Sequence, residues 1–171
     1  SLARRRERPP APTGRPDPGR QPTGGTRPVR RGTHGRGAVT VRLDKQVAVV
    51  TGSDSGIGQA IAIEFAREGA DVAVTYHTDE DGARETERLV LDAGGRAIVL
   101  RVDVTSEEQV EGLFAETLRR LGTPSILVNN AGMGGPGDEV ADLPTQAWRR
   151  VIETNLFGPF YGCRRFVALR R

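Results

Sequence analysis

The sequence has little cysteine, few aromatic residues and no long apolar run, and each shortage excludes a class of protein. A single cysteine, Cys163, rules out an intrachain disulfide and argues against a cysteine-based zinc site. No stretch approaches the roughly 18 apolar residues of a membrane span, and the N-terminus lacks the apolar segment of a secretory signal. We therefore expect a cytoplasmic protein that contacts no membrane.

Residues 1–41 differ in composition from the rest of the chain. They hold ten arginines against two acids, together with seven prolines and seven glycines. Such a segment cannot bury a core, which predicts a disordered tail. An arginine-rich arm for RNA or an acidic partner is the functional alternative. No aromatic side chain accompanies these arginines to stack on bases, so we do not expect nucleic acid as a partner.

Residues 42–171 carry 15 basic and 20 acidic side chains, so this part of the chain is mildly acidic. Along it, short apolar runs alternate with segments in which apolar residues recur at helical spacing. Short apolar runs predict buried strands over 46–52, 71–76, 96–103 and 125–132. Apolar residues at helical spacing predict helices over 58–69, 79–95 and 106–122, and from about Pro144 to the end. Alternating strands and helices are typical of an α/β fold with a doubly wound parallel sheet.

A glycine-rich turn, "TGSDSGIG", follows the first predicted strand and opens the first helix. Its glycines Gly52, Gly56 and Gly58 allow a tight turn and let a pyrophosphate approach the backbone. The unpaired N–H groups and the dipole of the helix N-terminus favour the same anion. The turn is therefore a candidate phosphate site.

This turn and three later motifs resemble the classical short-chain dehydrogenase/reductase family in order and spacing. They are "TGSDSGIG", "VDV" at 102–104, "NNAG" at 129–132 and "ETNLFGPF" at 153–160. The resemblance implies a Rossmann-type fold, an NAD(P) cofactor and oxidoreduction of a small alcohol, sugar or ketone. It implies Asn155 as a catalytic residue and the following cofactor-binding residues: Gly52, Ser53, Ser55, Gly56, Ile57, Gly58, Tyr76, His77, Asp103, Val104, Asn130, Ala131 and Gly132.

The choice between NAD and NADP depends on the end of the second predicted strand. A carboxylate there binds a ribose 2′-OH and repels a 2′-phosphate, but the sequence has Tyr76 and His77. This favours NADP, or use of both. Ser55 argues against NADP, because many NADP-using relatives carry a basic residue there. As a partial cation, His77 can meet a 2′-phosphate, and the alternative is an exposed histidine with no role.

The family's proton-transfer residues are missing from this sequence. The resemblance implies a Ser and a Y-x-x-x-K pair, in which the lysine lowers the pKa of the tyrosine. Lys45 is the single lysine and precedes the first predicted strand, so no such pair occurs. Tyr161 stands four residues before Arg165, and we interpret it as a packing residue. No metal ligands group together.

We therefore expect the N-terminal part of such a domain, truncated at the C-terminal side, with about four of its seven strands and no turnover of its own. The full-length parent would act on a small alcohol or carbonyl substrate, as a homo-oligomer. A non-catalytic nucleotide-binding or regulatory module is the alternative. In the last helix, we predict a buried stripe and a packed Cys163; the stripe comprises Trp148, Val151, Ile152, Leu156 and Phe160.

Overall fold

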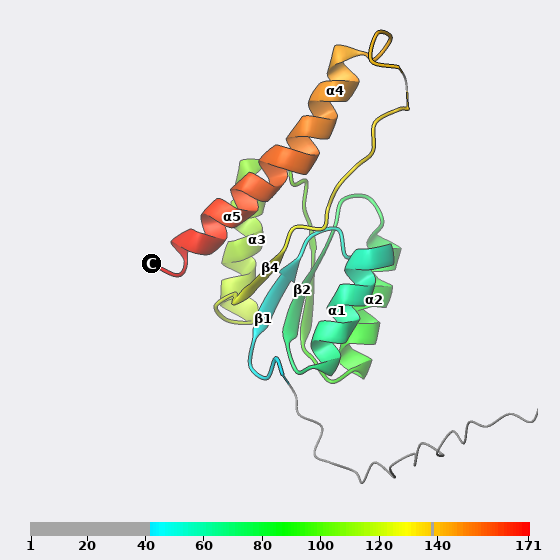
Figure 1. Cartoon of the computed structure of the whole chain (residues 1–171). Helices are drawn as coiled ribbons and strands as arrows, with labels where there is room; N and C mark the ends of the chain where they lie inside the picture. The colour runs from blue at the N-terminus through cyan, green and yellow to red at the C-terminus, as the bar shows by residue number, and fades with distance from the viewer. Residues whose placement is uncertain (1–41, 138) are drawn as a thin grey trace, which may run out of the picture. The chain divides into compact units, whose positions relative to one another are not determined.

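A computed structural model describes residues 42–137 and 139–171, and the tail predicted over 1–41 lies outside the described residues. Strands and helices alternate as predicted, and the strands form one parallel sheet in the order β3-β2-β1-β4 (Figure 1). The strands are β1 (Val47–Val50), β2 (Asp71–Tyr76), β3 (Ala97–Arg101) and β4 (Ile126–Val128). In the described part of the chain, no helix has both the length and the apolarity to cross a membrane.

Helices cover both faces of the sheet, which makes the fold doubly wound (Figure 1). One face packs against α1 (Gly56–Arg67) and α2 (Glu80–Asp92), and the other against α3 (Glu107–Arg120) and α5 (Gly158–Ala168). A short π-helical turn, η1 (Glu153–Phe157), joins α5 to the preceding helix α4 (Thr145–Ile152).

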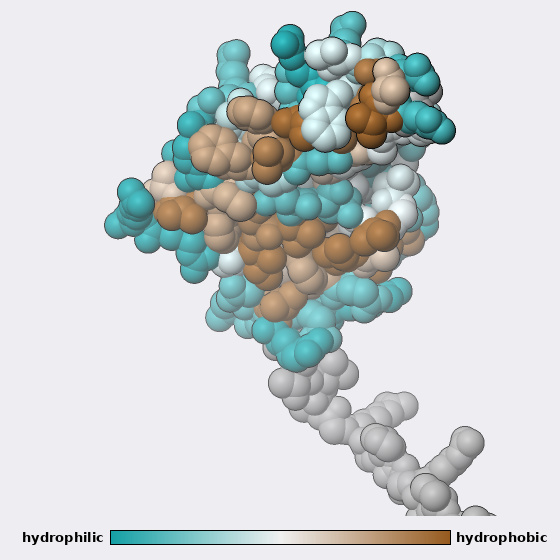
Figure 2. All heavy atoms as spheres, turned by 45° about the horizontal axis from the view of Figure 1, so that its top comes forward, coloured by the Kyte–Doolittle hydropathy of each residue, from teal (hydrophilic) through white to brown (hydrophobic). Residues whose placement is uncertain are grey.

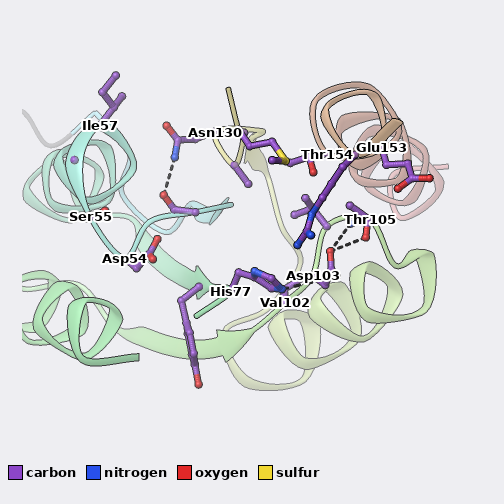
Figure 3. Close-up of a pocket in the computed structure, with 18 of the residues that line it drawn as sticks. Asp54, Ser55, Ile57, His77, Val102, Asp103, Thr105, Asn130, Glu153 and Thr154 are labelled. Atoms are coloured by element: carbon purple, nitrogen blue, oxygen red, sulfur yellow. Dashed lines mark hydrogen bonds and ion pairs between the residues drawn. The ribbon is translucent and has the colours of Figure 1, made fainter. Parts of the chain in front are cut away.

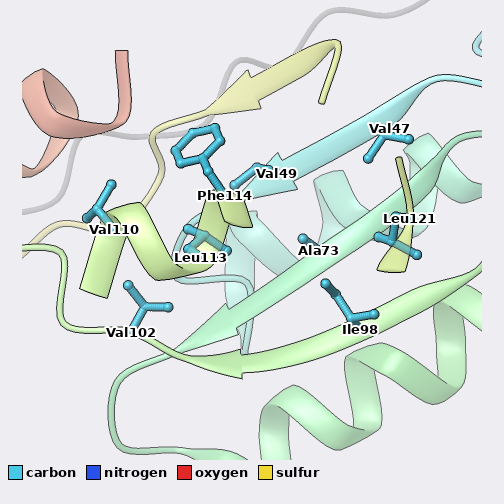
Figure 4. Packing of buried hydrophobic residues seen from close by; sticks show 9 residues of the cluster. All are labelled: Val47, Val49, Ala73, Ile98, Val102, Val110, Leu113, Phe114 and Leu121. Atoms are coloured by element: carbon cyan, nitrogen blue, oxygen red, sulfur yellow. The ribbon is translucent and has the colours of Figure 1, made fainter. Parts of the chain in front are cut away.

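Strand β1 shows why the predicted strands are apolar throughout. Val47 and Val49 belong to the core cluster on the α3 side (Figure 4), while Ala48 and Val50 belong to the cluster on the α1 and α2 side. All four residues are buried. A parallel strand with helices on both faces needs apolar residues at every position, not at every second one.

Polar side chains cap the starts of α2 and α3, and a glycine follows the end of α2. Asp79 accepts a hydrogen bond from the backbone N–H of Gly82 at 2.9 Å, and Ser106 accepts one from Gln109 at 3.3 Å. After α2, Gly94 takes a φ of +98°, a left-handed conformation that terminates a helix at little cost for glycine. The observed ends of α1, α2 and α3 thus lie within three residues of the predicted ones.

The predicted buried stripe on the last helix is wrong. Trp148, Leu156 and Phe160 are 55%, 61% and 52% exposed, and Val151 and Ile152 are half-buried. Hydrophobic side chains of the segment from α4 to α5 are therefore exposed at the surface. Figure 2 shows hydrophobic residues, in brown, beside hydrophilic ones on the face that it presents.

The helix packs instead through two glycines, beside Tyr161 and Phe166, which lie partly buried against the core cluster on the α3 side. A Cβ added at Gly158 would lie 3.0 Å from Cγ2 of Val104, and one at Gly162 would lie 2.7 Å from Oδ1 of Asn129. This close approach turns the larger apolar residues of the predicted stripe away from the sheet. Cys163 is also exposed rather than packed, with its sulfur 3.4 Å from the Asn129 amide nitrogen.

Candidate functional site

A cavity of about 1300 Å³ opens at the carboxyl ends of the strands. The turn after β1 and the ends of β2, β3 and β4 form one wall, and α4 and η1 form the other (Figure 3). Ligands of open parallel sheets bind at this edge. The strand order fits this position, because β1 lies between β2 and β4, and α1 after β1 and α5 after β4 pack on opposite faces of the sheet.

The three glycines of the first turn serve three different purposes. Gly52 has a φ of +60° and lies close to Ala131, whose Cα would be 3.0 Å from an added Cβ. Gly58 is packed against the turn, since its Cβ would lie 2.3 Å from the Gly52 carbonyl oxygen. Gly56 has a φ of +56° and faces open space, with no atom within 4 Å of an added Cβ.

Hydrogen bonds hold the turn to the neighbouring strand end. The Asn130 side-chain nitrogen donates to the carbonyl oxygens of Thr51 at 2.9 Å and Gly52 at 2.7 Å. The Thr51 hydroxyl accepts from the backbone N–H groups of Asn130 and Ala131, both at 3.0 Å. The backbone groups of this wall are thereby kept in one conformation.

Ser53 lies beneath the turn and not at the cavity surface. It is fully buried, and its hydroxyl donates to the Val50 carbonyl at 2.8 Å and accepts from the Thr75 N–H at 3.0 Å. The Thr75 hydroxyl in turn accepts from the N–H of Gly52 at 3.0 Å. Ser53 thus supports the turn from below.

The N-terminus of α1 is left open toward the cavity. Its N-cap residue, Ser55, makes no side-chain hydrogen bond to the helix, and the first turn holds no acidic residue. The helices α2 and α3 differ, because Asp79 and Ser106 cap them and acids fill their first turns. The first N–H groups of α1 are therefore available to an anion.

At the ends of β2 and β3, His77 and Asp103 face each other across the cavity floor (Figure 3). Nε2 of His77 lies 3.8 Å from Oδ2 of Asp103. Beside them, burial raises the pKa of Tyr76, and the neighbouring Glu80 carboxylate raises it further. Tyr76 therefore stays a neutral phenol at physiological pH.

Asp103 is held in its ionised form. Partial burial acts to raise the pKa of Asp103, but hydrogen bonds from the hydroxyl and backbone N–H of Thr105, with the charges of His77 and Arg150, outweigh it and lower the pKa. The two Thr105 bonds are 2.7 Å and 2.9 Å long. A fixed anion therefore faces this end of the cavity.

The α4 wall was missed by the sequence analysis. It brings Thr145, Gln146, Arg149, Arg150, Glu153 and Thr154 to the cavity, and the strand side adds Asp54, Val102, Thr105 and Met133. Within residues 42–137 and 139–171, neither Arg149 nor Arg150 makes an ion pair or a side-chain hydrogen bond. The only available signal was the pair "RR" on a helix that follows the fourth strand.

Asn155 stands behind the cavity wall, on η1. Its side-chain oxygen accepts from the N–H of Met133 at 2.9 Å, and its nitrogen donates to the Met133 carbonyl at 2.8 Å. A single side chain thus fastens the loop after β4 to the last helix. The π-helical turn is the local feature that carries Asn155, and such turns are frequent at functional sites.

Most residues predicted for the cofactor meet at this cavity. Those that line it are Gly52, Ser55, Gly56, Ile57, Tyr76, His77, Asp103, Val104, Asn130, Ala131 and Gly132. Ser53 and Gly58 are buried behind the turn, and Asn155 is behind the loop. Among the described residues, no cluster of histidine, cysteine, aspartate and glutamate is arranged to hold a metal ion.

Comparison with known proteins gives consistent matches. The profile of the family described as short chain dehydrogenase matches residues 46–169. Glucose 1-dehydrogenase 2 of Bacillus subtilis is 38% identical over 122 residues, which cover 71% of this chain and 47% of that protein. 3beta-hydroxysteroid dehydrogenase 1 of Eggerthella lenta is 42% identical over 127 residues, covering 73% and 48%.

Solved structures agree with the curated relatives. The crystal structure of hydroxysteroid dehydrogenase from Escherichia coli superimposes with a TM-score of 0.70 at 38% identity, covering 76% of this chain and 54% of that one. The chain spans about half the length of the curated relatives it matches.

Proposed function

The chain belongs to the short-chain dehydrogenase family, a family of oxidoreductases, and from this we propose that its cavity binds NAD or NADP. The whole protein would then act on a CH–OH or C=O group of a small alcohol, sugar or ketone. The observation that carries the proposal is the open N-terminus of α1, which meets a glycine-rich turn at the edge of the sheet where ligands bind.

The residues present fit a dinucleotide. Gly56 offers an open position where a pyrophosphate can approach the backbone, and no acidic side chain of the first helical turn opposes it. Asp103 and Val104 line the cavity at the other strand ends, where the family resemblance places the adenine. The cavity volume of about 1300 Å³ is ample for such a ligand.

The bound dinucleotide would supply the carbon that gives or takes a hydride. This chain's own residues would bind and orient it: the turn holds the phosphates, and Asn130 keeps the turn in place through Thr51 and Gly52. Asn155 would act by positioning the loop at Met133. Because no Y-x-x-x-K pair occurs in residues 1–171, we propose that this polypeptide binds the dinucleotide without turning it over by itself.

Binding is tested by titrating the protein with NADH and with NADPH and following the fluorescence of the reduced nicotinamide. The variant Gly56→Ala adds a methyl group that projects into the open position, so we expect affinity to fall about tenfold, as for the loss of one charge-assisted hydrogen bond. Gly94→Ala is the matched control, because Gly94 also has a positive φ and open space but lies at the end of α2. It should bind like the wild type.

Both substitutions place alanine at a positive φ, so both should lower stability by about 1 kcal/mol. Unfolding curves for the two variants therefore separate strain from binding. Absence of saturable binding of either dinucleotide to the folded wild-type protein would contradict the proposal. Steady oxidation of NAD(P)H with a carbonyl substrate would contradict the part that concerns turnover.

A further inference from the structure

The strand order assigns the two halves of a dinucleotide to the two sides of the cavity. The phosphates belong at the N-terminus of α1, which follows β1, and β1 lies between β2 and β4. In dinucleotide-binding sheets of this kind, the end of the second strand meets the ribose of the adenosine half. The adenosine half therefore belongs over the ends of β2 and β3, and the nicotinamide half over the end of β4.

The last helix passes close to the adenosine side of the cavity. A Cβ added at Gly158 would lie 3.0 Å from Cγ2 of Val104, the residue that follows the end of β3 by three positions. On η1, Glu153 and Thr154 line the cavity on the same side as Asp103 (Figure 3). From there the helix continues into α4, which stands beyond the carboxyl ends of the strands (Figure 1).

Arg150 of α4 brings a free cation to this side. It precedes Thr154 by four residues, about one helical turn, and lines the cavity with it. Its charge acts on Asp103, whose pKa it helps to lower. Within residues 42–137 and 139–171, however, Arg150 makes no ion pair or side-chain hydrogen bond. The exposed guanidinium thus faces Asp103 across space that the adenosine half can fill.

We propose that Arg150 covers the adenosine half of the bound dinucleotide by stacking its planar guanidinium on one face of the adenine. The inference rests on the proposed function and adds a residue of α4 that determines how tightly the adenosine half is held. Arginine suits this position because its guanidinium is planar, weakly hydrated and attracted to the face of an aromatic ring. Lysine has the same charge but no plane that can stack.

The test separates stacking from charge by three substitutions at Arg150, each titrated with NADH in the full chain. Arg150→Gln should weaken NADH binding about fivefold to tenfold, as for the loss of one partly desolvated cation–π contact. Arg150→Lys should weaken it about as much, because the compact ammonium stays hydrated. Arg150→Tyr should bind within about twofold of the wild type, since an aromatic ring also stacks on a base.

ADP-ribose supplies a second measurement, because it contains the adenosine half and the pyrophosphate but no nicotinamide. Its dissociation constant, obtained by competition with NADH, should change by the same factors in the three variants. Arg149→Gln is the matched comparison: Arg149 also lines the cavity, but it is not among the charges that lower the pKa of Asp103. It should weaken binding less than about twofold. Unfolding midpoints should agree among all variants, since both arginines are exposed.

Weak NADH binding by Arg150→Tyr would overturn the stacking, and wild-type binding by Arg150→Lys would then show that Arg150 contacts a phosphate. Binding that is unaffected by all three substitutions would overturn the inference as well, as would an ADP-ribose constant that does not follow the NADH constant, or an equal loss in Arg149→Gln. Failure of the folded wild-type protein to bind either ligand would instead overturn the proposed function, and this inference with it.

Discussion

The two walls of the cavity are built in different ways. The wall formed by the turn after β1 and the strand ends consists largely of backbone, tied by a buried hydrogen bond of Ser53 and partly buried ones of Thr51 and Asn130. The wall formed by α4 consists of exposed side chains, with none of its residues buried. Its link to the first wall includes the paired bonds of Asn155 to Met133.

We therefore expect the first wall to be rigid and the second wall to tolerate substitution. Substitutions in the first wall disturb close-packed backbone and buried polar groups. A buried polar group that loses its hydrogen-bond partner lowers the stability of the fold. Changes in the second wall alter side chains that meet solvent, where single substitutions are usually worth a few tenths of a kcal/mol. We therefore expect the first wall to determine whether a phosphate binds, and the second to modify what lies beyond it.

The largest effect should come from Gly58→Ala in the first wall. The new methyl carbon would lie 2.3 Å from the Gly52 carbonyl oxygen and 2.5 Å from the Asn130 side-chain nitrogen. Such overpacking should cost about 2–3 kcal/mol in urea unfolding and abolish dinucleotide binding.

Gly112→Ala is the control for this substitution. Gly112 lies inside α3 with nothing within 4 Å of an added Cβ. Alanine should stabilise the protein there by about 0.5–1 kcal/mol, because it restricts the unfolded chain and favours the helix. Equal unfolding midpoints for the two variants would contradict the close packing of the first wall.

A smaller effect is expected for Asn155→Ala, which removes both hydrogen bonds to Met133. The site is exposed, so the loss of stability should be about 1 kcal/mol. Hydrogen exchange at the Met133 amide should accelerate clearly, while exchange within β1 should stay unchanged. Asn129→Ala provides the comparison, since the Asn129 side chain bonds to Cys163 and not to Met133. Unchanged exchange at Met133 would show that Asn155 does not fasten this wall.

The smallest effect concerns Asp103→Asn. Because folding lowers the pKa of Asp103, its ionised carboxylate stabilises the folded protein. This stabilisation is fully present above the pKa of the unfolded chain, near 4, and is lost as pH falls through the lower pKa of the folded protein. The variant should therefore be less stable than the wild type by about 0.3–0.5 kcal/mol at pH 7, allowing for exposure. This difference should vanish near pH 3. A difference that is the same at both pH values would contradict the charge-based account.

The predicted strands are confirmed, and the first three predicted helices agree with the structure to within three residues at each end, because both depend on local physics. Buried parallel strands need continuous apolar residues, and residues such as Asp79, Ser106 and Gly94 satisfy the helix ends without help from distant parts of the chain. The glycine-rich turn is readable for the same reason, since Gly52 and Gly56 adopt conformations that other residues rarely adopt.

The predicted buried stripe on the last helix is wrong because more than one face of that helix can pack against the sheet. Trp148, Leu156 and Phe160 form an apolar stripe in the sequence, yet Gly158 and Gly162 allow the helix to approach Val104 and Asn129 more closely on its other side. Helical spacing shows which residues share a face. It does not show which face meets the sheet, because that depends on residues far away in the chain.

The sequence by itself determined the alternation of strands and helices, the helix ends and the glycine-rich turn, since these follow from backbone conformation and burial at neighbouring positions. Only the tertiary structure decided the second wall, with Arg149 and Arg150 at the cavity and Asn155 on the loop. It also decided the pairing of His77 with Asp103. These contacts join residues about twenty or more positions apart, and packing of the whole sheet is what brings them together.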